Sequence, residues 1–196
     1  ENKLGNDASM KARILTAAAC DMRMSGGNCP VMTSGGSGNQ GLGVVIPIVV
    51  VAEEQGIDKE KMLRAVFFGH LVNRYVKTFT GKLSGMCGCA IAAGIGASAG
   101  ITWMLGGDDD QISGACTNML ANLTGMLCDG AKETCALKLS TSAGEAVISA
   151  YLASEGLVIR NNVGIIGNTI EETIHNVGVL ARKGFNHIDD LVIDMI

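Results

Sequence analysis

The segment from Leu83 to Gly107, LSGMCGCAIAAGIGASAGITWMLGG, limits what this chain can fold into more than any other part of it. It holds seven glycines and two cysteines and has no charged residue. Its length would span a bilayer, but so many glycines favour buried helices that approach their neighbours closely. Aromatic residues make up only 4% of the chain, so the core must come from Ala, Val, Ile, Leu and Met.

Capping residues and apolar periodicity predict helices along most of the chain. Pro47 argues against a central strand in the apolar run that contains it, which we interpret as a helix. We find no internal repeat or linker, and predict an all-α single domain of small-residue-rich packed helices. The predicted helices cover residues 6–23, 43–55, 58–79, 85–105, 110–126, 131–154, 169–183 and 186–196.

Charge and cysteine usage exclude several classes of function. A net charge of −4 gives no sign of a nucleic acid or an anionic membrane as partner. No secretion signal is visible, so we expect a cytoplasmic protein in which the seven cysteines are not disulfide-bonded. They are then either small buried apolar residues or, in part, ligands of a metal or cluster.

The glycine-rich stretch TSGGSGNQGLG, residues 33–43, precedes the apolar run of residues 44–52. Such a stretch either connects two helices or lets backbone N–H groups approach a ligand. A phosphate loop is disfavoured because no GKS or GKT follows.

Two cysteines stand in the segment MLCDGAKETCALKLSTSAGEA. Cys128 and Cys135 are seven residues apart, which is two helical turns, so both thiols could face one side. Cys87 lies upstream and could join them. This spacing is neither that of a zinc ribbon nor that of a ferredoxin, and alone it leaves a metal site and plain core cysteines both open.

Three segments in order, GSGNQG, KLSGMCG and GMLCDGAKETCALKLSTSA, resemble the L-cysteine desulfidase family, which is related to the α-chain domain of iron–sulfur L-serine dehydratases. The resemblance covers essentially residues 1–196 and implies a catalytic helical domain. It also implies a [4Fe–4S] cluster held by Cys87, Cys128 and Cys135, with Cys89 as the rival for the first position. Cys20, Cys29 and Cys116 are then structural.

The implied reaction is a β-elimination that needs no pyridoxal phosphate. An open iron would bind the β-thiol of L-cysteine or the β-hydroxyl of L-serine as a Lewis acid. A base would remove the α-proton, and the products would be pyruvate, ammonia and, from cysteine, sulfide. Candidate bases are His70, whose ordinary pKa suits proton transfer, and Lys77 or Lys138 if desolvated. His175 and His187 lie in no motif.

In the same interpretation the glycine-rich stretch meets the carboxylate of the substrate. A helix that begins near Gly41 would favour the carboxylate at its N-terminus, and Arg23 could clamp it. Hydrogen bonds would come from Ser34, Ser37, Asn39 and Gln40.

The chain departs from this family at both ends. Members carry an N-terminal region with a cysteine in a GCTEP-like stretch, so we expect this chain to be a C-terminal half whose partner is that region. The serine dehydratases end in a cysteine tail, whereas this chain ends LVIDMI. The alternatives are a non-catalytic half that binds an amino acid or docks a partner, and a zinc site using the same thiols. Self-association as a homodimer is a further expectation.

Overall fold

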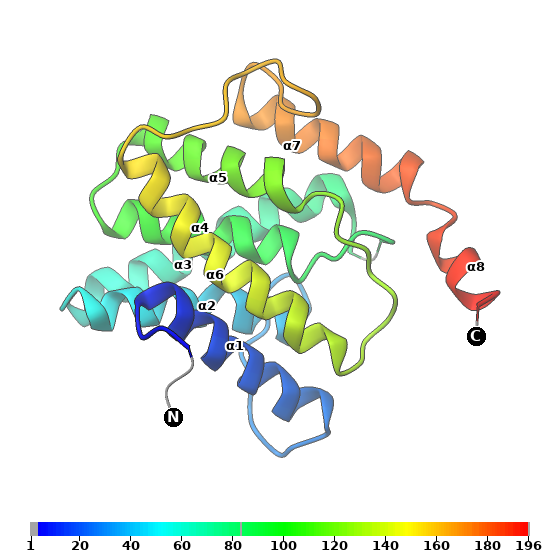
Figure 1. Ribbon diagram of the computed structural model, residues 1–196, viewed down its shortest axis with the longest axis horizontal. Helices are drawn as coiled ribbons and strands as arrows, with labels where there is room; N and C mark the ends of the chain where they lie inside the picture. The colour runs from blue at the N-terminus through cyan, green and yellow to red at the C-terminus, as the bar shows by residue number, and fades with distance from the viewer. Residues whose placement is uncertain (1–3, 83, 196) are drawn as a thin grey trace.

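The computed structural model describes residues 4–82 and 84–195. The regular secondary structure of this part of the chain is all helical, as predicted (Figure 1). Isolated bridges are the only β-type pairings within it. Leu83 of the KLSGMCG segment and Ile196 of the last predicted helix lie outside the described residues. The elements are α1 (Ala8–Met24), α2 (Gly38–Glu54), α3 (Lys59–Thr80), α4 (Ile91–Met104), α5 (Asp109–Leu123), α6 (Thr134–Ser154), α7 (Ile170–Val179), the π-helix η1 (Leu180–Gly184) and α8 (Ile188–Ile193).

Four helices begin at a side chain that caps them. Asp7, Asp58 and Asp108 each accept a hydrogen bond from a backbone N–H in the first turn of the following helix. Thr169 does the same for α7. Each cap satisfies an N–H group that has no carbonyl partner within its helix, which explains why these starts could be located from the sequence.

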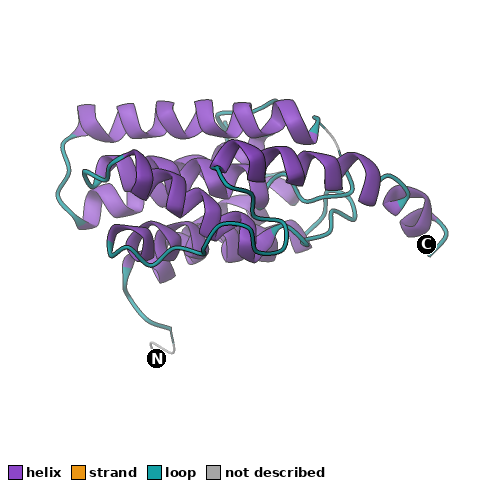
Figure 2. Ribbon diagram, turned by 90° about the horizontal axis from the view of Figure 1, so that it is seen from above, coloured by secondary structure: helices purple, strands orange, loops and turns teal. Residues whose placement is uncertain are grey.

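Helix α4 is the centre of the domain. All of its residues except Trp103 are buried, and it packs against α2, α3, α5 and α6. The helices run side by side in stacked layers, with α8 projecting at the C-terminal end (Figure 2). None of the helices in the described part of the chain combines the length and hydropathy that a membrane span needs.

Glycines bring α3 and α4 into direct backbone contact. A Cβ atom added to Gly96 would lie 2.4 Å from the carbonyl oxygen of Gly69, and one added to Gly100 would lie 2.8 Å from that of Ala65. Distances below 3.0 Å to backbone atoms cannot be relieved by a side-chain rotation. The glycines of the apolar segment therefore set the close approach that the sequence predicts.

The predicted helix 85–105 begins later than expected, at Ile91. The backbone of residues 85–87 pairs instead with residues 126–128: Cys87 N–H donates to Met126 O at 2.9 Å, and Cys128 N–H donates to Gly85 O at 2.8 Å. The two segments thus exchange hydrogen bonds that a helix would have used internally. Cys87 and Cys89 lie in an irregular turn as a result.

The same pairing contradicts the interpretation that Cys128 and Cys135 are related by two turns of a helix. Cys128 lies in the connection before α6, and only Cys135 is in the helix. The helix predicted for residues 131–154 begins at Thr134, and the last predicted helix is limited to Ile188–Ile193. Helix α2 begins at Gly38 rather than Gly43, because Ser37 caps it by accepting from Gln40 N–H.

Candidate functional site

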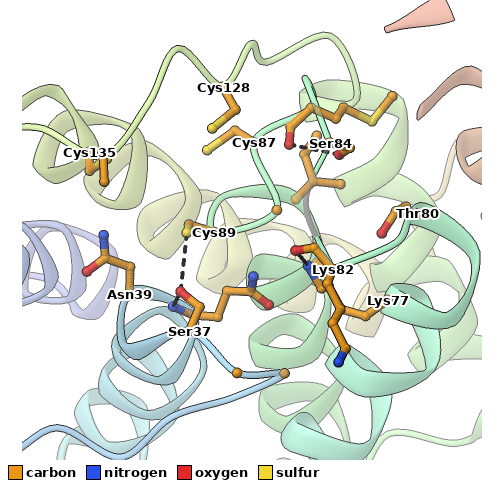
Figure 3. Close-up of a pocket in the computed structure, with 18 of the residues that line it drawn as sticks. Ser37, Asn39, Lys77, Thr80, Lys82, Ser84, Cys87, Cys89, Cys128 and Cys135 are labelled. Atoms are coloured by element: carbon orange, nitrogen blue, oxygen red, sulfur yellow. Dashed lines mark hydrogen bonds between the residues drawn. The ribbon is translucent and has the colours of Figure 1, made fainter. Parts of the chain in front are cut away.

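A cavity of about 890 Å³ opens where the glycine-rich stretch, the C-terminal end of α3, the turn before α4 and the start of α6 meet (Figure 3). Most of the residues singled out in the sequence line it. They are Arg23, Ser37, Asn39, Gln40, Lys77, Cys87, Cys128 and Cys135. Residues from five separate parts of the sequence, including Arg23 at the end of α1, are therefore brought to one place by the packing of the helices.

Four thiols line this cavity. Cys87 and Cys128 extend to the same side from the paired segments with their sulfur atoms next to each other, Cys89 lies between them and Ser37, and Cys135 lies at the start of α6 (Figure 3). All four are free cysteines. Cys89 Sγ and Ser37 Oγ are 3.8 Å apart, so Cys89 faces the start of α2. No three His, Cys, Asp or Glu side chains of the described residues are arranged to hold a single metal ion.

Burial favours the protonated form of two of these thiols. It raises the pKa of Cys87 to about 12 and also raises the pKa of Cys89. A thiol in such a position becomes a thiolate when a cation binds to it, and releases its proton in doing so. Binding of a metal centre here would therefore be coupled to loss of protons.

Positive charge surrounds the thiols. The lining includes a single acidic residue, Asp189, and five basic residues: Arg23, Arg74, Lys77, Lys82 and Lys138. Lys138 forms an ion pair with Asp129, whose carboxylate oxygen lies 2.5 Å from its Nζ. Burial opposes charge on Lys138, but the hydrogen bond with Asp129 and the attraction of Asp129, Cys87 and Cys128 together outweigh it, so the pKa of Lys138 is raised. In a chain with net charge −4, this local excess of cations favours an anionic ligand.

The guanidinium of Arg23 lies against the first turn of α2. Its Nη1 donates to Asn39 Oδ1 at 2.9 Å, and its Nε is 2.5 Å from where a Cβ on Gly38 would lie. A cation at a helix N-terminus is unfavourable because the helix dipole is positive there. The arrangement becomes favourable when an anion binds between the guanidinium and the N–H groups of the first turn.

Ser34 lies behind the cavity rather than in its lining. Its Oγ accepts a hydrogen bond from Asn73 Nδ2 at 2.7 Å and lies 2.7 Å from His70 Nδ1. Ser34 and Ser37 also exchange backbone hydrogen bonds of 3.1 and 3.0 Å, with Gly35 and Gly36 at positive φ between them. Ser34 was predicted to contact the substrate. In the structure it lies outside the cavity lining and anchors the glycine turn to α3.

The Ser34→Ala variant is expected to lower the free energy of unfolding by about 1–3 kcal/mol, because it leaves the buried Asn73 amide and the His70 ring without their partner. Urea unfolding followed by circular dichroism measures this change. Ser154→Ala is the control, since the Ser154 hydroxyl donates only to a carbonyl of its own helix. Equal stabilities of the two variants would contradict the anchoring role.

The candidate bases occupy different places. Lys77 lines the cavity, where its Nζ donates to Lys82 O at 2.5 Å, and burial lowers the pKa of its amine. His70 contacts Ser34 and is not in the lining, although burial lowers its pKa too. His175 lies in a separate cavity of about 330 Å³ beside Phe79.

A residue outside any sequence motif adds to the site. Arg74 lines the cavity because α3 places it one turn before Lys77, and helical spacing from Lys77 is the signal that could have found it. Asn73 lies behind the cavity with Ser34. Of the cysteines expected to be structural, Cys20 and Cys116 are buried. Cys29 is exposed, so it does not have the core position assigned to it.

Nearly the whole chain is similar to known proteins. The serine dehydratase alpha chain family matches residues 1–194. A UPF0597 protein of Clostridium botulinum (strain Okra / Type B1) is 66% identical over 195 residues, which are 100% of this chain and 45% of the relative. UPF0597 proteins of Caldanaerobacter subterraneus and Desulfotalea psychrophila are 49% and 44% identical, over 97% and 98% of this chain and 45% and 44% of theirs.

The chain thus spans less than half the length of the curated relatives it matches. No solved structure matches it significantly. The family match extends over almost every residue, including the thiol-bearing segments and the glycine-rich turn that line the cavity. The chain belongs to the serine dehydratase alpha chain family.

Proposed function

We propose that this domain provides the cluster-binding and substrate-binding site of an iron–sulfur-dependent β-elimination lyase that acts on L-cysteine, with L-serine as the alternative substrate. The observation that carries the proposal is the convergence of Cys87, Cys128 and Cys135 on one cavity opposite the start of α2. Pyruvate and ammonia would be the products, together with sulfide when the substrate is cysteine.

The residues present fit a [4Fe–4S] cluster. Cys87, Cys128 and Cys135 would hold it, since thiolates are the ligands that iron–sulfur clusters use and all three are free and face one cavity. Each thiolate binds a different iron, so the sulfur atoms need not meet at one point as they would around zinc. Lys138, which its ion pair with Asp129 keeps charged, would help to balance the negative charge of the thiolates.

When bound, such a cluster supplies a Lewis-acidic iron that weakens the bond between Cβ and the sulfur or oxygen of the substrate. The protein supplies the orientation. Arg23 and the first N–H groups of α2 would hold the carboxylate, and Asn39 fixes the guanidinium in place. Gln40 is almost fully buried, and its Oε1 has no hydrogen-bond partner among the described residues, so a ligand or water must satisfy it.

Lys77 would remove the α-proton. Of the three candidate bases, Lys77 and Lys138 line the same cavity as the thiols, whereas His70 lies behind the glycine turn. The ion pair of Lys138 with Asp129 favours its charged form, which cannot accept a proton. A lysine whose amine is partly desolvated has a lower pKa than a free lysine, which favours the neutral amine that a base requires. His70 then acts as a positioning residue through Ser34.

Anaerobic reconstitution with iron and sulfide tests the proposal. The protein is expected to bind about four irons per chain and to show the broad visible absorption of an iron–sulfur cluster, and the Cys128→Ser variant is expected to lose both. Cys29→Ser is the matched control, because Cys29 is exposed and outside the cavity.

Iron binding that survives in Cys128→Ser, or that is lost equally in Cys29→Ser, would contradict the proposed ligand set. Cys89→Ser resolves the remaining choice at the first position: loss of iron there, with retention in Cys87→Ser, would transfer that role to Cys89.

A further inference from the structure

Helix α3 carries an apolar stripe that nothing in the described structure covers. Leu63, Phe67, Leu71 and Tyr75 follow one another at intervals of four residues, and their exposed fractions are 52%, 64%, 50% and 43%. Residues four apart lie on the same side of a helix, so these side chains form one continuous surface. The opposite side of α3 packs against α2, α4 and α7.

The composition of the stripe is that of a binding surface. Two of its four members are aromatic, and aromatic residues carry much of the binding energy where proteins meet. From the exposed fractions, the four side chains present roughly 400 Å² of apolar surface, within the range of patches that are often functional on isolated proteins.

The stripe runs into the candidate active site. Arg74, next to Tyr75, and Lys77 on the following turn both line the cavity. Arg74 makes no ion pair with any described residue, although Arg64 at the other end of the stripe is paired with Glu60 at 2.7 Å. Whatever covers the stripe therefore reaches the rim of the cavity, where it meets an uncompensated positive charge.

The area of the stripe disfavours a second copy of this chain as the occupant. A stable dimer buries about 800 Å² on each partner, about twice what the stripe offers. Interfaces between domains of one polypeptide are smaller, about 600–1,500 Å² in total.

The chain spans only 45% of the length of its Clostridium botulinum relative, so a larger remainder of the polypeptide exists there to fill this role. We propose that the stripe Leu63, Phe67, Leu71 and Tyr75 is the docking surface for that remainder. The docked segment presents an apolar face to the stripe and a carboxylate to Arg74. This inference concerns a protein interface and does not depend on the reaction proposed above.

Photo-crosslinking in the full-length protein tests the inference. A photoreactive benzoylphenylalanine replaces Phe67, whose exposure allows the change without repacking the core. Mass spectrometry is expected to find a crosslink within one polypeptide, from position 67 to the region outside residues 1–196. The control places the same residue at Leu137 on α6, which is 71% exposed and on a helix that does not pack against α3.

A crosslink from position 67 to a second copy would overturn the inference. The absence of any crosslink from position 67 would overturn it too, if mass spectrometry shows that the photoreactive residue was consumed. A crosslink to the same peptide from both positions would show non-specific capture and would overturn it too. A second variant, Arg74→Glu, is expected to reduce the yield of the position-67 crosslink severalfold; an unchanged yield would overturn the role of Arg74.

Discussion

The Lys77→Met variant of the full-length protein is expected to form pyruvate from L-cysteine about 100-fold or more slowly than the unchanged protein, because a positioned base contributes about 10²–10⁴-fold to such a reaction. Methionine keeps most of the length and apolar character of the lysine stem while it removes the amine. Pyruvate and sulfide release under anaerobic conditions measure the rate, and the iron content is expected to stay unchanged.

Two controls make this result specific. Lys82→Met removes a second amine from the lining of the same cavity but leaves the carbonyl that accepts from Lys77, and it is expected to change the rate little. His70→Asn tests the rival base. A Lys77→Met variant that works at nearly the normal rate, together with an inactive His70→Asn variant, would transfer the role of base to His70.

The Gly96→Ala variant is expected to lose about 3 kcal/mol or more of stability, at the upper end of what overpacking costs. The added methyl group would lie 2.4 Å from the carbonyl oxygen of Gly69, so α3 and α4 must separate. Because α4 is the centre of the domain, the movement would also disturb its packing against α2 and α6. Thermal and urea unfolding of the variant measure the loss.

Gly125→Ala is the matched control, since a Cβ at Gly125 meets no atom within 4 Å. Its stability is expected to change by about 0.5 kcal/mol or less. If Gly96→Ala were as stable as Gly125→Ala, the close contact between α3 and α4 would be contradicted.

The sequence by itself determined the fold class and most helix starts. Helices α1, α3, α5 and α7 begin within about two residues of their predicted starts, where Asp7, Asp58, Asp108 and Thr169 cap them. A cap is a contact between residues three apart, so the local sequence contains all the information it needs. The glycines between residues 83 and 107 likewise predicted close packing, because few other roles for them fit a buried apolar segment.

Only the tertiary structure decided how the site is assembled. Periodicity extended one helix back to Gly85, and a seven-residue spacing suggested that Cys128 and Cys135 face one side as they would on a helix. Residues 85–87 and 126–128 exchange backbone hydrogen bonds instead. A long-range pairing of this kind replaces the local hydrogen bonds that periodicity assumes.

The same limit applies to Ser34 and Cys29. The partners of Ser34 lie on α3, 36 and 39 residues away, which makes it an anchor of the turn. Cys29 has no such partners and is exposed. Residue type and spacing identified the groups capable of the chemistry, whereas contacts between distant segments decided which of them face the cavity, because those contacts form only when the helices pack.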